Sequence, residues 1–361
     1  MMRRIYSSVI IAVIIAVGYV SMAAADEWDK VLAAAKKEGT VAVIGPTGSS
    51  RQDTLTLPFE KKYGIKVEYW VARGAEVGPK IMAERKAGKF LWDVSIGGVS
   101  PALNVQLAGG MLDPIEPALI LPEVKDPKQW RGGRIEYADA EKRILVMMVT
   151  QRGTLYVNPK IVKPESITSY KDLLNQKFKQ KIVLDDPTTA GPGQATFTFF
   201  YLHPALGPKF IRELAKQEPT VLRDYLQELD GIAREKFLVA IGVTDIIAEE
   251  RIKAGMSIAI LDPRKIKEGT DIGSVAGALT MFNRAPHPNA TKVYINWLLS
   301  KEGQTDYARL NGNISARLDV PTDHAPWRVP MPNAIKSYDR AAEDVKDDMV
   351  AVFKEAFGGR R

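Results

Sequence analysis

The sequence predicts an α/β protein with two domains, each built around a doubly wound and mostly parallel sheet. Short β-branched or apolar runs alternate with amphipathic helical segments along most of the chain, and this order produces strands covered by helices. Three of these runs end in turns of small residues that lead into a helix. The length of 361 residues exceeds what one small core usually organises, which favours two domains.

The first 25 residues have the pattern of a secretory signal peptide. Arg3 and Arg4 form a basic start, residues 9–20 form an apolar core, and three alanines ending at Ala25 suit a small-residue cleavage site. We therefore expect cleavage after Ala25 and an exported mature chain that starts at Asp26. An uncleaved membrane anchor is the alternative, but the apolar core is short for a membrane span.

The composition excludes several function classes. Cysteine is absent, so the chain has no disulfide, thiolate metal site or cysteine nucleophile. The net charge is +7, or +5 without the two arginines of the signal segment, but the lysines and arginines are scattered along the chain. Because the sequence has no basic helix, zinc-finger spacing or aromatic RNA-binding box, nucleic acid is not an expected partner.

The first half of the mature chain has the pattern of alternating helices and strands. Gly39 is a natural stop for the first helix, and β-branched residues mark the strand that follows it. We expect helices at 27–38, 52–63, 77–87 and 101–108, and strands at 40–44, 67–71 and 92–96. The proline-rich stretch 113–133 is expected to be irregular.

The second half continues with more helices than strands. The strand at 182–184 ends before Pro187, because proline cannot extend a central ladder. We expect strands at 143–149, 154–157, 182–184 and 257–261, an apolar stretch at 274–282, and helices at 166–174, 195–202, 209–217, 220–229, 245–254, 289–299 and in the tail 334–357.

Small and polar residues follow three of the strands, at the ends where a doubly wound sheet binds its ligands. Backbone N–H groups, hydroxyls and the start of a helix together favour an anion or another polar ligand. The residues expected at this site are Thr47, Gly48, Ser49, Ser50, Arg51, Gly97, Gly98, Ser100, Pro187, Thr188, Thr189, Gly191 and Gly193. Ordinary strand-to-helix connections are the alternative, and the turns contain no nucleotide-binding motif.

Two arginines are the expected contacts for a negative charge. Arg51 lies in the first turn of a helix, where a cation opposes the helix dipole, so a bound carboxylate or phosphate would compensate for it. Arg152 lies at a predicted hinge and is interpreted in the same way. For both, an exposed and solvated arginine is the alternative.

Three further residues complete the predicted ligand-binding set. Tyr156 either lines the site or packs inside the hinge. Thr244, like its neighbour Asp245, is a potential cap for the following helix. Asp262 ends a strand directly before a proline.

The sequence offers no convincing catalytic or metal constellation. Asp185 and Asp186 resemble a pair of acids for hydrolysis, but directly before a proline such residues more often form a turn. His203, His287 and His324 are far apart in the sequence, and two of them precede prolines, so we expect no metal site. We likewise expect no cofactor and no enzymatic activity.

Several segments resemble a known family. The segments are 285–290 (APHPNA), 294–304 (YINWLLSKEGQ), 63–67 (YGIKV), 155–158 (LYVN), 173–174 (LL) and 182–187 (IVLDDP). In this order they are similar to the solute-binding proteins of bacterial ABC importers, in the branch that contains ferric-ion, thiamine, phosphonate and sugar-phosphate binders. The resemblance covers nearly the whole mature chain.

The resemblance implies a type II periplasmic-binding-protein fold, in which two α/β lobes with doubly wound mixed sheets enclose a ligand cleft. The limits that it implies are 26–150 plus 280–312 for lobe one, 151–276 plus 313–361 for lobe two, and crossing strands near 150–156, 275–279 and 313–318. Ligand-driven closure would then be a hinge motion about a few residues.

The resemblance also implies a function. The protein is expected to be a periplasmic monomer that captures a small, anionic solute and delivers it to an ABC permease in the inner membrane. Ferric-ion transport is an alternative, but the family's iron binders use neighbouring tyrosines, and this sequence has no Tyr-Tyr pair. An exported hydrolase and a sensor with the same fold are further alternatives.

Overall fold

The computed structural model describes residues 26–71, 74–274, 276–322, 325–331 and 334–358. The predicted signal segment and its cleavage site at Ala25 lie outside the described residues. The chain divides into two compact units, and it passes from one to the other three times. Unit 1 is Met1–Met148 with Val275–Thr322, and unit 2 is Val149–Ser274 with Asp323–Arg361.

These limits differ from the predicted lobes mainly at residues 313–322, which were expected in lobe two and belong to unit 1. Residues 149–150, expected in lobe one, belong to unit 2, and residue 276, expected in lobe two, belongs to unit 1. For residues 313–322 the reason is Arg317, which is 1% exposed and donates hydrogen bonds to the backbone oxygens of Leu299 and Glu123 at 3.1 and 3.0 Å. The two lobes as functional bodies, and a cleft between them, stay a prediction.

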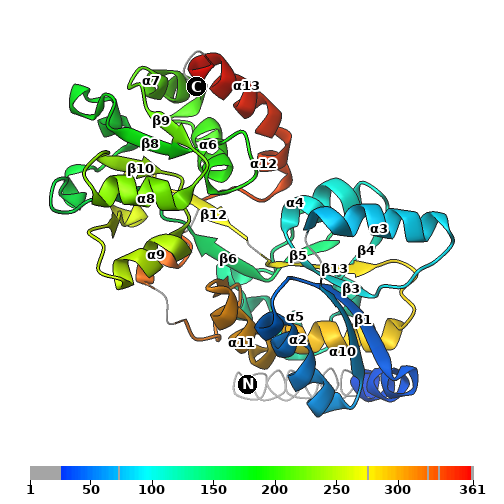
Figure 1. The fold of residues 1–361 in the computed structure, drawn as a ribbon. Helices are drawn as coiled ribbons and strands as arrows, with labels where there is room; N and C mark the ends of the chain where they lie inside the picture. Colours follow the sequence, from blue (N-terminus) through cyan, green and yellow to red (C-terminus); the bar gives the residue numbers. More distant parts are fainter. Residues whose placement is uncertain (1–25, 72–73, 275, 323–324, 332–333, 359–361) are drawn as a thin grey trace, which may run out of the picture. The chain divides into compact units, whose positions relative to one another are not determined.

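Unit 1 is built on a six-stranded sheet in the order β2-β1-β3-β13-β4, with β5 also paired to β13 (Figure 1). The strands are β1 (Thr40–Gly45), β2 (Lys66–Val71), β3 (Val94–Gly97), β4 (Leu112–Asp113), β5 (Ile144–Val146) and β13 (Ala278–Phe282). β1 is parallel to β2 and β3, whereas β13 is antiparallel to β3, β4 and β5. The sheet is therefore mixed.

Helices cover both faces of this sheet, with α3 and α10 on opposite sides in Figure 1. Besides the helix over residues 26–38, the helices are α2 (Ser49–Tyr63), α3 (Gly74–Lys86), α4 (Val99–Pro101) with the π-helix η1 (Ala102–Leu107), α5 (Pro122–Lys125), α10 (Pro288–Leu298) and α11 (Lys301–Asn311). Short 3₁₀ helices are η2 (Glu116–Ala118), η3 (Pro127–Gln129) and η4 (Arg131–Gly133), and β14 (Ile314–Ser315) follows α11.

Unit 2 is built on a five-stranded sheet in the order β11-β7-β10-β8-β9. The strands are β7 (Leu155–Val157), β8 (Ile182–Asp185), β9 (Thr220–Leu222), β10 (Val239–Ile241) and β11 (Ala259–Ile260). β8 is parallel to β9 and β10, whereas β7 is antiparallel to β10 and β11. In addition, β6 (Met148–Gln151) is antiparallel to β12 (Asp271–Gly273), which is parallel to β15 (Ile335–Lys336).

The helices of unit 2 pack around this sheet, and α13 lies against α6 and α7 (Figure 1). The helices are α6 (Pro192–Leu202), α7 (Gly207–Ala215), α8 (Tyr225–Ala233), α9 (Asp245–Lys253), α12 (Arg340–Asp344) and α13 (Lys346–Phe357). Short 3₁₀ helices are η5 (Pro164–Ser166), η6 (Tyr170–Leu174), η7 (Gln176–Phe178), η8 (Pro263–Lys265) and η9 (Pro326–Arg328).

Each unit has its own aromatic core. In unit 1, Phe59 of α2 packs against Tyr294 and Trp297 of α10, with ring centroids 5.0 and 5.4 Å apart. In unit 2, Phe197 of α6 packs against Phe353 of α13 at 5.3 Å. Apolar burial of this kind is the main force that holds each unit together.

Some predicted elements differ from the structure. Residues 220–222 form strand β9 rather than the start of a helix, because they pair with β8. Residues 166–174 form short 3₁₀ helices rather than one helix, although Ser169 begins η6 with a capping box. Helix α11 and the strands β10 and β12 were not expected. Among the described residues, no helix is long and apolar enough to cross a membrane.

Candidate functional site

In unit 1, two of the predicted turns lie at the same edge of the sheet. β1 and β3 are parallel neighbours, paired through Val43 with Val94 and Ile44 with Ser95. Their carboxyl ends therefore lie side by side, and the turns that follow them lead into α2 and α4. This is the arrangement that the sequence predicted for the residues 47–51 and 97–100.

The N-terminus of α2 is open and carries no negative charge of its own. Gly48 occupies the N-cap position with a φ of 114°, no side chain caps the helix, and its first turn contains no acidic residue. Thr47, Ser49 and Ser50 are exposed, as is Gly48. Arg51 is half-buried, and its Nη1 atom donates to the Thr47 carbonyl at 3.0 Å. The helix dipole and this guanidinium together favour an anion here.

A tyrosine that the sequence analysis missed fixes this turn. The Tyr69 hydroxyl donates to the Pro46 carbonyl at 3.0 Å. Its ring lies so close to Gly45 that a Cβ atom there would be 1.9 Å from the hydroxyl oxygen. Burial raises the pKa of Tyr69, so the phenol stays protonated and remains a donor.

The N-terminus of α4 also lacks a side-chain cap. Gly98 is the N-cap, it provides no side-chain cap, and Gly97, Gly98 and Ser100 are half-buried. Beneath this turn, Gln106 donates to Ser95 Oγ at 3.2 Å and accepts from Thr280 Oγ1 at 2.9 Å. These buried hydrogen bonds hold the end of β3 against the helix that follows it.

In unit 2, the turns after β8 and β10 also meet at one edge. The two strands are parallel neighbours. Gly242, which follows β10 with a φ of 78°, approaches Gly193 so closely that a Cβ atom on Gly242 would lie 2.9 Å from the Gly193 Cα atom. The sequence predicted the turn at 187–193, but not its contact with residue 242.

The sequence analysis predicted that the N-terminus of α6 receives a ligand. In the structure, the side chain of Asp185 lies there. Its Oδ2 atom accepts from the Gly193 N–H at 2.8 Å, and a Cβ atom on Gly193 would lie 2.6 Å from Oδ2. Burial and the neighbouring Asp186 raise the pKa of Asp185 to about 6, against the lowering effect of the Gly193 hydrogen bond. An internal carboxyl group thus already uses a backbone donor of this helix.

The other polar residues of this turn make hydrogen bonds within the turn. Asp186 accepts from both the N–H and the Oγ1 of Thr188, at 2.9 and 2.7 Å, and pairs with Arg223 at 2.8 Å. Thr189 is exposed and donates to the Asp186 carbonyl at 3.1 Å. Pro187 is buried and Gly191 is half-buried. Asp185 and Asp186 thus act as the predicted turn formers.

Arg152 is paired with carboxylates of its own unit. Its Nε atom lies 3.5 Å from Asp271 Oδ2, and its Nη2 atom donates to the Pro192 carbonyl at 3.0 Å. Burial alone would lower the pKa of Arg152, but Asp271 and Asp245 raise it above its ordinary value. The guanidinium is charged, yet its charge is already balanced within unit 2.

Tyr156 packs inside unit 2. It is 0% exposed, and its hydroxyl lies 2.8 Å from the Gly153 carbonyl, the Val243 carbonyl and Asp245 Oδ1. Burial and the nearby Asp245 raise its pKa well above the ordinary value. Because its hydroxyl bonds to residues on both sides, the side chain links residue 153 to the turn after β10.

Structural contacts were also found for three polar residues near helix starts, Thr244, Asp245 and Asp262. Thr244 is the N-cap residue of α9, but its side chain makes no capping hydrogen bond. Asp245 instead accepts from the Gly153 N–H at 3.1 Å, so neither side chain is the cap that we expected. Asp262 caps the three-residue helix η8 and pairs with Arg264 at 2.5 Å.

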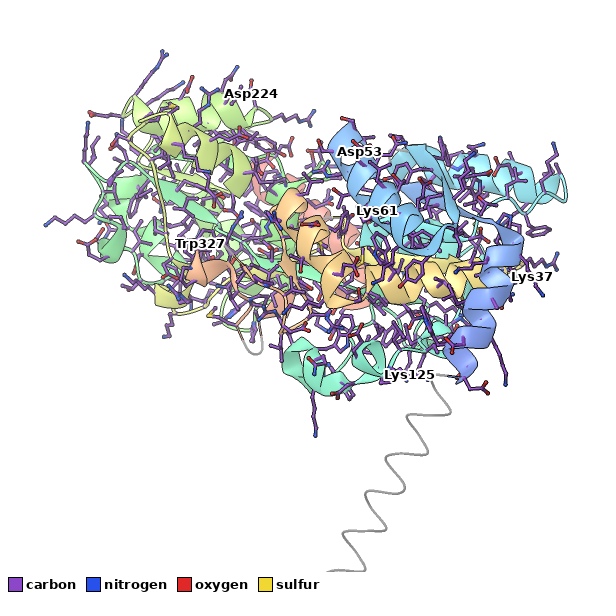
Figure 2. All side chains as sticks on the ribbon, turned by 90° about the horizontal axis from the view of Figure 1, so that it is seen from below. Lys37, Asp53, Lys61, Lys125, Asp224 and Trp327 are labelled. Carbon is purple, nitrogen blue, oxygen red and sulfur yellow. The ribbon has the colours of Figure 1, made fainter. Side chains whose placement is uncertain are left out.

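Two residues of α8, Tyr225 and Glu228, lie near this edge of the sheet. The sequence analysis did not predict either of them as a site residue. A Cβ atom on Gly191 would lie 3.0 Å from the Tyr225 hydroxyl. Glu228 is 0% exposed, and burial, Asp185 and Asp224 raise its pKa to about 9. Asp224, labelled in Figure 2, caps α8 by accepting from the N–H of residue 226 at 2.8 Å. The signal for Glu228 in the sequence is an acidic residue on the apolar face of a helix. It was missed because this helix was predicted at 220–229, whereas α8 begins at Tyr225.

The described part of the chain holds no group of three or more His, Cys, Asp or Glu residues that could bind a metal ion. The donors of both units are instead backbone N–H groups, hydroxyls and guanidinium groups. This chemistry suits hydrogen bonding to a polar solute.

Solved structures of periplasmic binding proteins are similar to this one. Iron-bound HitA from Pseudomonas aeruginosa has a TM-score of 0.62 and 13% identity over 88% of this chain and 99% of that chain. AfuA from Actinobacillus pleuropneumoniae, with exogenous fructose-6-phosphate bound, has a TM-score of 0.60 and 17% identity over 89% and 99%. Ferric iron-binding protein A from Mannheimia haemolytica has a TM-score of 0.69 and 14% identity over 88% and 98%. These likenesses confirm the predicted fold class.

The sequence comparisons point to the same group of proteins. An uncharacterised protein from Haemophilus influenzae is 23% identical over 278 residues, which cover 75% of each chain. The sequence profile described as bacterial extracellular solute-binding protein matches residues 54–333, which is most of the chain. The chain therefore belongs to the bacterial extracellular solute-binding protein family, the binding components of ABC importers that its sequence resembles.

Proposed function

We propose that this protein captures a small anionic solute in the periplasm as a monomer and delivers it to an ABC permease. It is a binding protein in this proposal and has no enzymatic activity. The observation that carries the anionic preference is the open N-terminus of α2, which has no acidic residue in its first turn and has Arg51 beside it. Backbone N–H groups and a guanidinium at a helix start attract negative charge.

The two units differ in how well they support an anion. In unit 1, the hydroxyls of Thr47, Ser49 and Ser50 are exposed around the helix start. In unit 2, Asp185 already accepts from α6 and Arg152 is already paired with Asp271. Unit 1 is therefore the proposed binding site for the negative group. Fructose 6-phosphate, the ligand in the AfuA structure, is an example of a solute with such a group.

The first experiment is to identify the solute by native mass spectrometry of protein purified from its own periplasm. The second is calorimetry with that solute on the Arg51→Ala variant. Loss of a charged hydrogen bond costs about 1.5–3 kcal/mol, so we expect binding to weaken roughly ten- to a hundredfold.

Lys61→Ala is the matched control, since Lys61 lies in the last turn of the same helix (Figure 2). It removes the same charge from the far end of α2 and should leave the affinity unchanged. If the Arg51 variant folds normally and binds like the wild type, the anionic site in unit 1 is wrong. Turnover of any compound in a panel of esters and phosphates would favour the hydrolase alternative.

A further inference from the structure

We propose that Tyr69 is a positioning residue of the binding site in unit 1, where its hydroxyl holds the turn that orients Arg51 toward an anion. This inference rests on the proposed function, because it says how the site at the start of α2 keeps its shape. Tyr69 lies on β2, a strand to which none of the predicted site residues belongs. It acts through Arg51 and needs no contact with the solute.

The first argument is how Tyr69 reaches the turn. β2 is the parallel neighbour of β1 at the edge of the sheet, and Tyr69 is paired with Val43. From there its ring extends across Gly45, where a Cβ atom would lie 2.2 Å from the ring atom Cζ. The hydroxyl donates to the carbonyl of Pro46 at 3.0 Å. A side chain of the neighbouring strand thus anchors the residue that directly follows β1.

The second argument is that the next carbonyl belongs to the site. Thr47 follows Pro46, and its carbonyl accepts from Nη1 of Arg51 at 3.0 Å. The Pro46 carbonyl lies in one plane with the N and Cα atoms of Thr47, because the peptide bond is planar. Fixing the first carbonyl therefore restrains the second. The phenol of Tyr69 holds in place the acceptor to which the guanidinium is bonded.

The third argument is the state of the phenol and its distance from solvent. Burial raises the pKa of Tyr69, and Arg51 lowers it to a smaller extent. The phenol therefore remains a donor at neutral pH, and the effect of Arg51 shows that the positive charge lies close to it. Tyr69 is half-buried, whereas Thr47, Gly48 and Ser49 are exposed. The exposed residues are accessible to a solute, and Tyr69 supports their turn.

The test is an NMR titration with inorganic phosphate at pH 7, followed by the backbone amide signals of Ser49 and Ser50. Tyr69→Phe removes the hydroxyl and keeps the ring. We expect phosphate binding to weaken about three- to tenfold, the value of one neutral hydrogen bond. Tyr137→Phe is the matched control and should bind like the wild type. The Tyr137 hydroxyl, also in unit 1, has no hydrogen-bond partner among the described residues.

A double variant separates positioning from a purely structural role. Arg51→Ala leaves no guanidinium to orient, so adding Tyr69→Phe should weaken phosphate binding by less than about twofold further. A hydroxyl that only stabilises the fold would act alike in both backgrounds. Equal losses from Tyr69→Phe in the wild type and in Arg51→Ala, or no loss in either, overturn the proposal.

Gly45→Ala reaches the same contact from the other side. The new Cβ atom would lie 1.9 Å from the phenol oxygen, so the ring has to move. We expect a loss of phosphate affinity close to that of Tyr69→Phe. In Tyr69→Ala no ring has to be displaced, and Gly45→Ala should there cost less than about twofold. An equal cost in both backgrounds would contradict the role of the ring.

The side chain of Arg51 separates this inference from the proposed function. Its Nε–H signal is followed by NMR without phosphate, and we expect Tyr69→Phe to move it toward the signal of a free arginine, whereas Tyr137→Phe leaves it in place. If phosphate does not bind the wild type but Tyr69→Phe moves this signal, the anionic site fails and the positioning of Arg51 stands. A signal that Tyr69→Phe leaves unchanged overturns the positioning role, whether or not phosphate binds.

Discussion

At the scale of single residues, buried carboxyl groups dominate the chemistry of unit 2. Asp185, Glu228 and Asp245 are each less than 9% exposed. Burial penalises the charged form of these carboxyl groups and raises the pKa of each. The stability of the protein should therefore depend on pH at these positions.

The Glu228→Gln variant tests this dependence. The unfolded chain releases the Glu228 proton near the ordinary value of 4.5, whereas the folded chain holds it up to about 9. Between these values the folded state binds more protons, so wild-type stability falls as pH rises, by at most about 1.4 kcal/mol per pH unit. The variant carries no such proton.

We therefore expect Glu228→Gln to match the wild type near about pH 5 and to exceed it near about pH 9, in urea unfolding followed across this range. Gln227→Glu, at an exposed position of the same helix, is a control that should follow the wild-type curve. A constant difference between wild type and Glu228→Gln at every pH would contradict a raised pKa.

The sequence located several candidate residues but not their partners. Arg51 lies at an open helix start, as its position in the sequence predicted. Arg152 was expected to meet a ligand, but Asp271, more than a hundred residues away in the sequence, pairs with it. Such a contact depends on the pairing of β6 with β12, and local patterns contain no information about it.

At the scale of elements, the close approach of two turns organises unit 2. Gly242 and Gly193 follow different strands, and their backbones are in contact. Turn residues of this kind are recognisable in a sequence, but the need for glycine at residue 242 is visible only when β8 and β10 are known to be neighbours.

Gly242→Ala should destabilise the protein more than Gly255→Ala does. Both positions have a positive φ, 78° and 86°, which costs a non-glycine residue about 1–2 kcal/mol. Only at Gly242 would the new Cβ atom meet backbone, 2.9 Å from the Gly193 Cα atom, while at Gly255 nothing lies within 4 Å. We expect an additional cost of about 1–3 kcal/mol from this overlap, measured by denaturant unfolding. Equal losses in the two variants would show that the turns can separate freely.

Element boundaries were predictable where the local sequence decides them. Gly64 ends α2 in the left-handed conformation with a φ of 68°, as a C-terminal glycine should. Residues 220–222 were wrongly predicted as helical because their three apolar or β-branched residues fit either structure. Pairing with β8, a tertiary effect, decides in favour of the strand.

At the scale of the whole molecule, the sequence profile establishes the family. The chemical class of the solute is the property that experiments have to determine. Iron-bound relatives make ferric ion the main alternative. We expect no tyrosinate-to-iron absorption band when ferric citrate is added to the solute-free protein. Tyr156, Tyr170 and Tyr294 are wholly enclosed, and burial raises the pKa of each.

Tyr225 is the half-buried phenol at the edge of unit 2, and burial with Asp185 nearby raises its pKa to about 12. A raised pKa opposes formation of the tyrosinate that ferric ion needs. The Tyr225→Phe variant is the control in the same titration. A strong visible band in the wild type that disappears in this variant would establish an iron site and contradict our proposal.

Export is the second prediction at this scale. The basic start and apolar core that end at Ala25 predict a mature chain beginning at Asp26. Mass spectrometry of the periplasmic protein should give a mass that lacks the first 25 residues. Intact protein that retains Met1 would identify the segment as an anchor instead.

The path of the chain has a consequence for its synthesis. In unit 1, β13 joins β3 to β4 and β5, yet it comes more than a hundred residues after all of them in the chain. On the ribosome, the sheet of unit 1 therefore remains in separate pieces until residue 282 has emerged. Unit 2 similarly awaits α13, which covers α6 and α7. A nascent chain that cannot close either core early remains unfolded for longer, and an unfolded chain is the form that can be threaded through a secretion channel.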